Sequence, residues 1–441
     1  MCGKNCFKSV MVLGFALFAM FFGAGNLIFP PYLGLEGGTN WGWGFISFIV
    51  VDAGLAVIAL ISVFKTGKGF SGVTEKLGPV LSPLLIAVTV LCLGPLAAIP
   101  RTAATTFELG VQPLLPNCPS WISAVAFFSV VTLLCVRPAK IVDIVGRFLS
   151  PLMFLCIIAL VVVGIVTPIG TTIGGAVPSE LVREGLESGY QTMDMLGALL
   201  FSAVVLSSLK TQGYNDRRSQ LRMTAMSGGV AALGMFLVYG GLSYLGASSS
   251  SVFSLDLGQA GLLLAITNGL LGTAGQVLLG VIVACACLTT AIGLVSACAE
   301  SFVDLSHGKL KYVPMVLAIS AFSLVVSTLG ISKIIALSSP VLEIIYPVLM
   351  TLVLLTLANG QIKSRYVYRG AALFALVVSA YVTLDGLVAA DLGSSMLPLA
   401  GIGLGWVLPA ALGGLIGAAI KDRKPRRLPA HKAAKSGAHG A

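Results

Sequence analysis

Long apolar runs recur from the first dozen residues almost to the end of this 441-residue chain. A helix needs about 20 apolar residues to cross the hydrocarbon core of a bilayer, which is roughly 30 Å thick, and these runs are of that length. Hydrophobic residues make up 57% of the chain and charged residues only 10%, which is too little charge to cover a soluble globule. The sequence therefore predicts a chain that crosses a lipid bilayer many times.

The apolar runs favour helices over a barrel. They are continuous and rich in Leu, Ile, Val and Ala, whereas the strands of an outer-membrane barrel alternate apolar and polar residues. We therefore predict an all-α polytopic membrane protein, with a further short surface helix at 257–270. The expected membrane spans, about twelve, lie at 12–36, 41–64, 80–107, 119–136, 147–168, 189–209, 224–246, 271–302, 312–330, 334–358, 370–388 and 399–420.

The basic residues predict the orientation of these spans. With the N-terminus in the cytoplasm, 24 of the 27 Lys and Arg residues fall in cytoplasmic segments, as expected for a protein of the bacterial inner membrane. The first apolar run continues into membrane-type sequence with no cleavage site, so we expect it to remain as a span. Both ends are then cytoplasmic, as an N-terminus at 1–11 and a basic tail at 421–441. This distribution accounts for the net charge of +10 without a nucleic-acid partner.

The cysteines and histidines indicate neither a disulfide framework nor a metal cluster. Of the nine cysteines only Cys118 is expected in an external loop, and all three histidines fall in predicted cytoplasmic segments. Cys285 and Cys287 are two residues apart and point away from one another on a helix. No cofactor is predicted.

The first span contains residues that are unusual in the middle of a membrane helix. Gly23, Gly25 and Asn26 interrupt its apolar run, and irregular backbone is tolerated at this depth where it lines a cavity. Unwinding would free amide N–H groups that can bind a carboxylate and carbonyls that can bind a cation. The alternative is that the two glycines only allow close helix packing.

The eighth span carries two adjacent hydroxyl residues, Thr289 and Thr290. Hard cations prefer oxygen ligands, so these hydroxyls and the carbonyls freed in the first span are a candidate sodium site. The alternative is that each hydroxyl only donates to the backbone carbonyl four residues back in its own helix, as most membrane threonines do.

Several ionisable residues fall within predicted spans, where such residues are expected to be paired or functional. Asp194 is a candidate for coupling transport to an ion. The roles of the others stay open between structure and coupling; they are Asp52, Arg101, Glu108, Glu300 and Glu343.

Four motifs in separate spans, taken together, resemble the bacterial branched-chain amino acid carriers of system II. The motifs are FGAGNLIFPP at 22–31, GPLAAIPRTA at 94–103, GYQTMD at 189–194 and CLTTAIGL at 287–294, followed by LGISK at 329–333 and IYP at 345–347. The resemblance covers nearly the whole chain except the basic tail. That family is similar to the amino acid, polyamine and cation superfamily of transporters.

The resemblance implies a leucine-transporter-like fold of two inverted five-helix repeats, with the first and sixth helices broken around a midplane site. The first repeat would span 12–168 and the second 189–358, with two further helices at 370–420. A short internal similarity between 13–19 and 196–202 supports the two repeats.

The resemblance also assigns roles to individual residues. Amides near Gly23, Ala24 and Gly25 would hold a substrate carboxylate. The apolar surroundings of the break further suggest that an aliphatic side chain is enclosed by Phe21, Phe22 and Phe201. Phe201 and Ser202 match the break of the sixth helix, where the substrate binds beneath an aromatic ring, so both are predicted substrate-binding residues. Ser207 and Ser208 are a second possibility for the break. The implied sodium ligands are the carbonyls of Ala19, Phe22 and Ala286 and the hydroxyls of Thr289 and Thr290. Asn26 and Asp194 are candidates for a second ion or for coupling.

The predicted function is sodium-coupled uptake of leucine, isoleucine and valine by alternating access. A proton-coupled carrier of another neutral amino acid, using an acid such as Asp194 or Glu343, is the alternative. A membrane enzyme is disfavoured because no catalytic constellation of His, Asp, Glu or Ser is found in the predicted spans.

Overall fold

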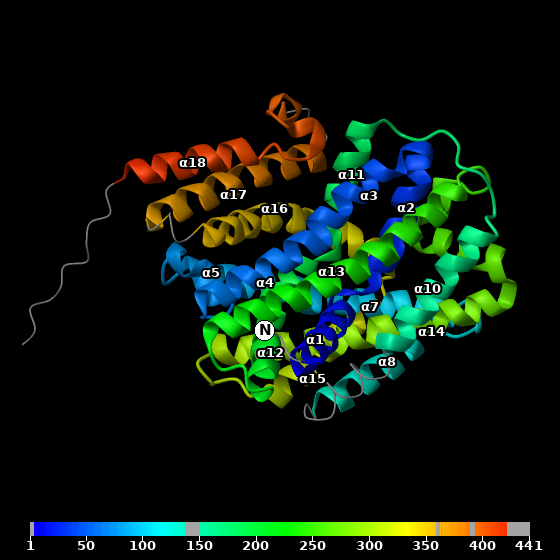
Figure 1. Cartoon of the computed structure of the whole chain (residues 1–441), viewed down its shortest axis with the longest axis horizontal. Helices are drawn as coiled ribbons and strands as arrows, with labels where there is room; N and C mark the ends of the chain where they lie inside the picture. Colours follow the sequence, from blue (N-terminus) through cyan, green and yellow to red (C-terminus); the bar gives the residue numbers. More distant parts are fainter. Residues whose placement is uncertain (1–3, 137–149, 359–361, 363, 389–392, 421–441) are drawn as a thin grey trace, which may run out of the picture.

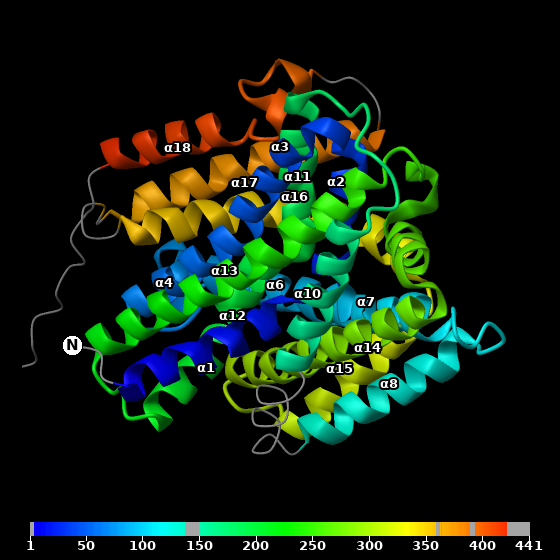
Figure 2. The same cartoon turned by 45° about the vertical axis from the view of Figure 1, so that its right-hand side comes forward.

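The computed structural model describes residues 4–136, 150–358, 362, 364–388 and 393–420, and in these parts of the chain every regular element is a helix. This confirms the predicted all-α class (Figures 1 and 2). Several predicted features lie outside the described residues: the tail at 421–441, residues 1–3 of the N-terminus, the basic residues within 137–149, and Lys363.

The helices fall into two halves in chain order. Those of the first half are α1 (Lys4–Phe21), α2 (Ala24–Gly37), α3 (Trp41–Ile49), α4 (Leu55–Thr66), α5 (Ser71–Thr74), α6 (Leu81–Leu91), α7 (Ala98–Thr105), α8 (Ser120–Cys135) and α10 (Ser150–Val166). Those of the second half are α11 (Pro178–Thr192), α12 (Asp194–Thr211), α13 (Arg217–Ser248), α14 (Gly258–Leu305), α15 (Tyr312–Ser327), α16 (Ile331–Leu357), α17 (Arg365–Val388) and α18 (Val407–Ala419).

Helix length and apolarity support a membrane location. Seven helical segments of the described chain are long and apolar enough to cross a bilayer, and one of them, Ala24–Thr66, turns back on itself between α2 and α3. Five shorter apolar helices accompany them: Phe7–Phe21, Ser120–Cys135, Ser150–Val166, Tyr312–Ser327 and Val407–Ala419. The predicted short helix at 257–270 is present as the first part of α14, which bends at Gly272, where φ is +58°.

The helices pack in two outer groups around a central one. In Figures 1 and 2, α16, α17 and α18 lie side by side along one flank and α8, α14 and α15 along the opposite flank. Helices α1, α2, α4, α12 and α13 lie between them, and α13 is in contact with each of the other four. Helix α13 is therefore at the centre of this group.

Small residues let the central helices approach closely. A Cβ atom added at Gly34 in α2 would lie 1.9 Å from the Ser243 carbonyl oxygen, and one added at Gly246 in α13 would lie 1.8 Å from the Pro31 carbonyl oxygen. Close backbone contact of this kind is the way in which helices gain packing energy in lipid, where the hydrophobic effect does not drive them together.

The first apolar helix is broken where the sequence predicted. Helix α1 ends at Phe21 and α2 begins at Ala24, so Phe22 and Gly23 are not helical. Gly23 donates its N–H to the side-chain Oδ1 of Asn26 at 3.1 Å, whereas in a continuous helix it would donate to the carbonyl of Ala19. The carbonyl of Ala19 therefore loses its helical partner.

The break between α11 and α12 differs from the predicted one. It falls at Met193, whose φ is +66°, and not at Phe201–Ser202 or Ser207–Ser208, all of which lie inside α12. The helical unit also begins earlier than the predicted limit of 189, at Pro178. The physical reason is that the left-handed residue is neither Gly nor Pro, so the sequence carries no conventional break signal at this position.

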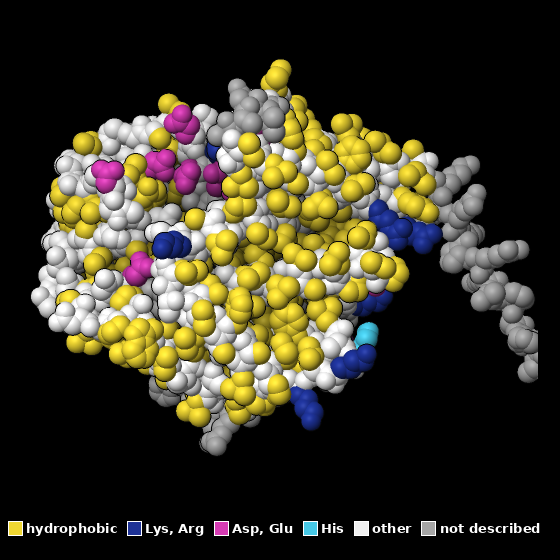
Figure 3. All heavy atoms as spheres, turned by 180° about the vertical axis from the view of Figure 1, so that it is seen from behind, with side chains coloured by type: hydrophobic (Ala, Val, Ile, Leu, Met, Phe, Trp, Pro, Cys, Tyr) yellow, Lys and Arg dark blue, Asp and Glu magenta, His cyan; other side chains and the backbone are white. Residues whose placement is uncertain are grey.

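The surface separates charges of opposite sign. Figure 3 shows Asp and Glu gathered towards one end, most Lys and Arg towards the other, and mainly hydrophobic side chains between them. Glu36, Glu180, Glu184 and Glu187 lie near enough to one another to interact electrostatically at the acidic end. A hydrophobic band between two charged ends is the arrangement expected of a protein that spans a bilayer.

Candidate functional site

The two helix breaks meet at one small cavity. The space left free inside it is about 20 Å³, room for about one water molecule, so the site is nearly closed in this structure. Gly23, Ala24 and Asn26 line it from the first break, and Met193 and Asp194 line it from the second. Irregular backbone from two helical units therefore faces a single cavity, in agreement with the rule that such backbone at membrane depth lines a cavity.

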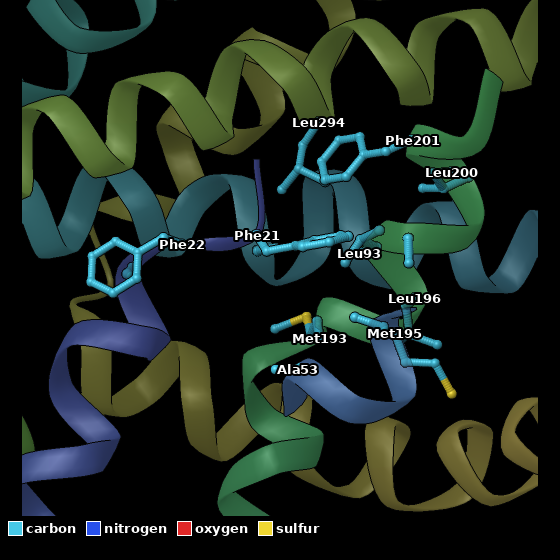
Figure 4. Packing of buried hydrophobic residues seen from close by; sticks show 14 of the residues in the cluster. Phe21, Phe22, Ala53, Leu93, Met193, Met195, Leu196, Leu200, Phe201 and Leu294 are labelled. Atoms are coloured by element: carbon cyan, nitrogen blue, oxygen red, sulfur yellow. The ribbon is translucent and has the colours of Figure 1, made fainter. Parts of the chain in front are cut away.

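One side of the cavity is apolar. Phe21 and Phe201, with ring centroids 6.3 Å apart, lie there with Leu93, Met193 and Leu294 (Figure 4). Met20, Ala98 and Gly197 also line the cavity. The chemistry of this surface suits contact with a branched aliphatic group, because its side chains present carbon or sulfur atoms.

The other side is polar and carries charge. Asn26, Arg101 and Asp194 line it together with the hydroxyl residues Thr102, Thr192 and Thr290. Arg101 is 3% exposed and Asp194 5%, so the two charges are removed from bulk solvent. A small molecule with a hydrophobic body and a polar, charged end matches this division.

The five predicted sodium ligands come together beside the first break. The hydroxyl of Thr289 is 3.4 Å from the carbonyl oxygen of Ala19 and 2.9 Å from that of Ala286. The hydroxyl of Thr290 is 3.3 Å from the carbonyl oxygen of Phe22. All five are uncharged oxygens, a donor set that suits a monovalent hard cation. Helix α14 thus contacts the end of α1 through the atoms that the resemblance named.

Asn26 connects the first break to buried acids. Its Nδ2 donates to Asp194 Oδ2 at 3.0 Å and to the Tyr239 hydroxyl at 2.6 Å, and lies 3.4 Å from Asp52 Oδ1. Its Oδ1 accepts from Gly23, as described above. All of these residues are buried. Asn26 therefore fixes the broken backbone and two carboxyl groups at the same time.

Three predicted substrate residues lie outside the cavity lining. The ring of Phe22 points away and stacks on Phe18 and Tyr239, at centroid distances of 5.3 and 5.9 Å (Figure 4). The hydroxyl of Ser202 donates to the Leu199 carbonyl within α12 at 2.7 Å. Gly25 lies next to the cavity, and a Cβ atom there would be 3.0 Å from Arg101 Nη2.

Sequence reasoning missed part of the polar cluster. The sequence marks Asp52 only as an ionisable residue within a span, and it gives no signal for Tyr239, although both contact Asn26. Asp52 lies in the π-helical turn Val50–Gly54 between α3 and α4. An acid within an apolar run is a signal for a site, whereas one tyrosine in a long apolar helix is not.

Two acids whose roles were open have structural contacts. Glu108 accepts the N–H of Ile331 at 2.8 Å and so caps the first turn of α16. Glu343 interacts with Thr383 of α17 and electrostatically with Arg183 and Glu187 of α11. Neither residue lines the cavity.

Curated relatives match the chain over almost its full length. The branched-chain amino acid permease BrnQ of Bacillus subtilis strain 168 is 35% identical over 424 residues, covering 92% of this chain and 96% of the relative. The branched-chain amino acid transport system 2 carrier protein of Pseudomonas aeruginosa is 36% identical over 432 residues. The match covers 95% of this chain and 97% of the relative.

Solved structures show the same fold at low identity. A nucleobase-cation-symport-1 family transporter, in a closed conformation with bromovinylhydantoin bound, superposes with a TM-score of 0.64 at 16% identity, covering 93% of this chain and 91% of the other. A Na+-coupled sialic acid symporter in a substrate-bound outward-open state gives a TM-score of 0.60 at 13% identity. The superposition covers 94% of this chain and 91% of the symporter.

The family model described as branched-chain amino acid transport protein matches residues 6–424. Its members among the curated relatives are named as permeases and carriers, which are not enzymes. A match of this extent, together with the full-length relatives, shows that the chain is a multi-pass membrane transporter that belongs to the branched-chain amino acid transport protein family.

Proposed function

We propose that the protein is a secondary active transporter that takes up leucine, isoleucine and valine together with sodium by alternating access. The observation that carries this proposal is the meeting of two helix breaks at one cavity with an apolar side and a charged side. Five uncharged oxygens from α1, α14 and the residue after α1 lie beside that cavity. The names of the relatives support the substrate class.

The proposed architecture has twelve spans in two inverted five-helix repeats followed by two helices. Counting α1 with α2, α3 with α4, α6 with α7, and α11 with α12 as one span each gives twelve together with α8, α10, α13, the part of α14 after Gly272, and α15 to α18. Breaks in the first and sixth spans fit this arrangement. We place the protein in the bacterial inner membrane with both termini in the cytoplasm, a position supported by the basic end seen in Figure 3.

The function is tested by uptake of labelled leucine into proteoliposomes. We expect an inward sodium gradient to drive accumulation when potassium and proton gradients are absent. Accumulation driven by a proton gradient alone would contradict sodium coupling and favour the second candidate. The buried acids around Asn26 are the observation in favour of that candidate, because carboxyl groups at membrane depth can carry protons.

Competition between amino acids for uptake tests whether the cavity has an apolar part and a charged part. Isoleucine and valine are expected to displace labelled leucine, with valine weaker by about 0.8 kcal/mol because it buries one CH₂ group fewer. Glutamate and lysine should compete far less well, since a second charge would lie against Phe21, Phe201 and Leu294. Displacement by glutamate or lysine at the concentration effective for valine would contradict the proposed substrate class.

Thr290→Val should weaken the response to sodium. Valine keeps the size of threonine and removes one oxygen, so we expect the sodium concentration for half-maximal leucine uptake to rise by about tenfold or more, since each lost ligand costs on the order of 1–3 kcal/mol. Sodium titrations of the two proteins in matched proteoliposomes measure this shift.

Thr267→Val is a matched control. Thr267 is a fully buried threonine of the same helix, and its hydroxyl donates only to the carbonyls of Leu263 and Leu264, both at 3.0 Å. We expect this variant to keep the wild-type sodium dependence. Overlapping sodium curves for Thr290→Val and wild type would remove Thr290 from the proposed site.

A further inference from the structure

Arg101 is a buried cation that lines the cavity and has N–H donors that are not used in hydrogen bonds. It lies in the first turn of α7, which follows the non-helical backbone at Gly94, and it is 3% exposed. Its Nη1 donates to the carbonyl oxygen of Gln191 at 2.7 Å, while its buried Nε has no hydrogen-bond partner in the described chain. A guanidinium group has five N–H donors, so one hydrogen bond leaves most of its capacity unused.

Among the residues that the structure describes, no carboxylate forms an ion pair with this charge. Within the described residues the ion pairs closer than 4.0 Å join Lys68 to Glu75 and Arg183 to Glu187. Asp194 acts on Arg101 electrostatically, but its Oδ2 accepts a hydrogen bond from Asn26 Nδ2. Arg101 also lies over the ring of Phe29, but its Cζ is 6.0 Å from the ring centroid, which is long for a cation–π contact. Arg101 therefore presents an arginine fork, the group best suited to a planar carboxylate, at the polar side of the cavity.

The amino-terminal turn of α2 faces the same place. A Cβ atom on Gly25 would be 3.0 Å from Arg101 Nη2, so the guanidinium lies against this turn. The first N–H groups of a helix have no intrahelical partner and attract anions, and α2 is 14 residues long. The Gly23 N–H is already bonded to Asn26, which leaves those of Ala24 and Gly25.

We propose that Arg101 binds the α-carboxylate of the amino acid substrate, together with the first amides of α2. This inference rests on the proposed function and deepens it, because it makes the carboxylate a requirement for binding that is enforced by a side-chain charge. The hydrophobic part of the substrate then extends towards Phe21, Phe201 and Leu294. Arg101 is thus a specificity-determining residue and not only a brace for the end of α11.

The test compares leucine with leucinamide, which lacks the carboxylate charge. Affinities for both are measured by the ligand-induced shift in melting temperature of the purified protein. In Arg101→Gln we expect the affinity for leucine to fall by about 10- to 100-fold while that for leucinamide stays nearly unchanged, because a charge-assisted bond is lost only for leucine. Arg183→Gln is the matched control, since Arg183 pairs with Glu187 away from the cavity, and it should keep the wild-type ratio.

Arg101→Lys covers the case in which the glutamine variant does not fold. Lysine keeps a positive charge and loses the planar fork, so leucine affinity should fall by about tenfold with leucinamide unaffected. An unchanged ratio of leucine to leucinamide affinity in either folded variant would overturn the role of Arg101 and leave the proposed function intact. Wild-type protein that binds no leucine, isoleucine or valine would overturn the proposed function itself.

Discussion

Gly246→Ala is expected to prevent the protein from folding to its native stability. The added Cβ would lie 1.8 Å from the Pro31 carbonyl oxygen and 2.7 Å from its carbonyl carbon. Because these are backbone atoms, no side chain can rotate to relieve the clash, and α13 must move away from α2. Overpacking of this kind costs about 1–3 kcal/mol even when side chains can adjust, so we expect a larger loss here. Melting temperature in detergent and abundance in the membrane measure it.

Gly229→Ala is the matched control in the same helix. Nothing lies within 4 Å of a Cβ atom at Gly229, so the substitution meets open space. It should be neutral or stabilise α13 by up to about 1 kcal/mol through helix propensity. If Gly246→Ala were as stable and as abundant as Gly229→Ala, the close crossing of α2 and α13 would be wrong.

The membrane fold was predictable because the bilayer determines both the type and the length of the elements that cross it. Apolar runs of fixed length must be helices, and their positions follow from hydropathy. The first break was also predictable, since Gly23 and Gly25 stand beside the polar Asn26 in an apolar run. The preference of a hard cation for oxygen ligands already joined Thr289 and Thr290 to the carbonyls freed at this break. The particular carbonyls were named only through the resemblance to a known family, because nothing local shows which carbonyls a hydroxyl will approach.

The second break could not be placed by the same reasoning. Met193 adopts a left-handed conformation without being glycine, and only Asp194, an acid at the start of a helix, marks the position. The internal similarity between 13–19 and 196–202 did not help, because the first segment precedes its break and the second follows its break. A similarity among apolar residues cannot align two segments when most of the chain is apolar.

The polar cluster depends on contacts between residues far apart in the chain. Asn26 meets Asp194 across 168 positions and Tyr239 across 213. Each acid was recognisable because ionisable residues are rare in spans, but their convergence on one amide is a property of the packing. The same holds for Arg101, whose role became visible only when its neighbours at Gly25 and Gln191 were known.

Asn26→Asp is expected to abolish most transport. The amide Nδ2 that donates to Asp194 and Tyr239 would be replaced by an oxygen, and a third carboxyl group would be added beside Asp52 and Asp194. Loss of a charge-assisted donor in a buried site costs about 1.5–3 kcal/mol, and repulsion adds to this, so leucine uptake should fall by about 100-fold. Initial rates in proteoliposomes measure the loss.

Two further results distinguish this cluster from ordinary packing. Asn40→Asp, the matched control, changes an asparagine that donates to the Ala176 carbonyl at 3.2 Å outside the cavity, and it should transport normally. Activity of Asn26→Asp should recover partly as the pH is lowered, because a protonated aspartate regains a donor of nearly the same shape and removes one negative charge. A variant that stays folded and transports leucine at the wild-type rate at neutral pH would show that the cluster does not hold the first break in its working shape.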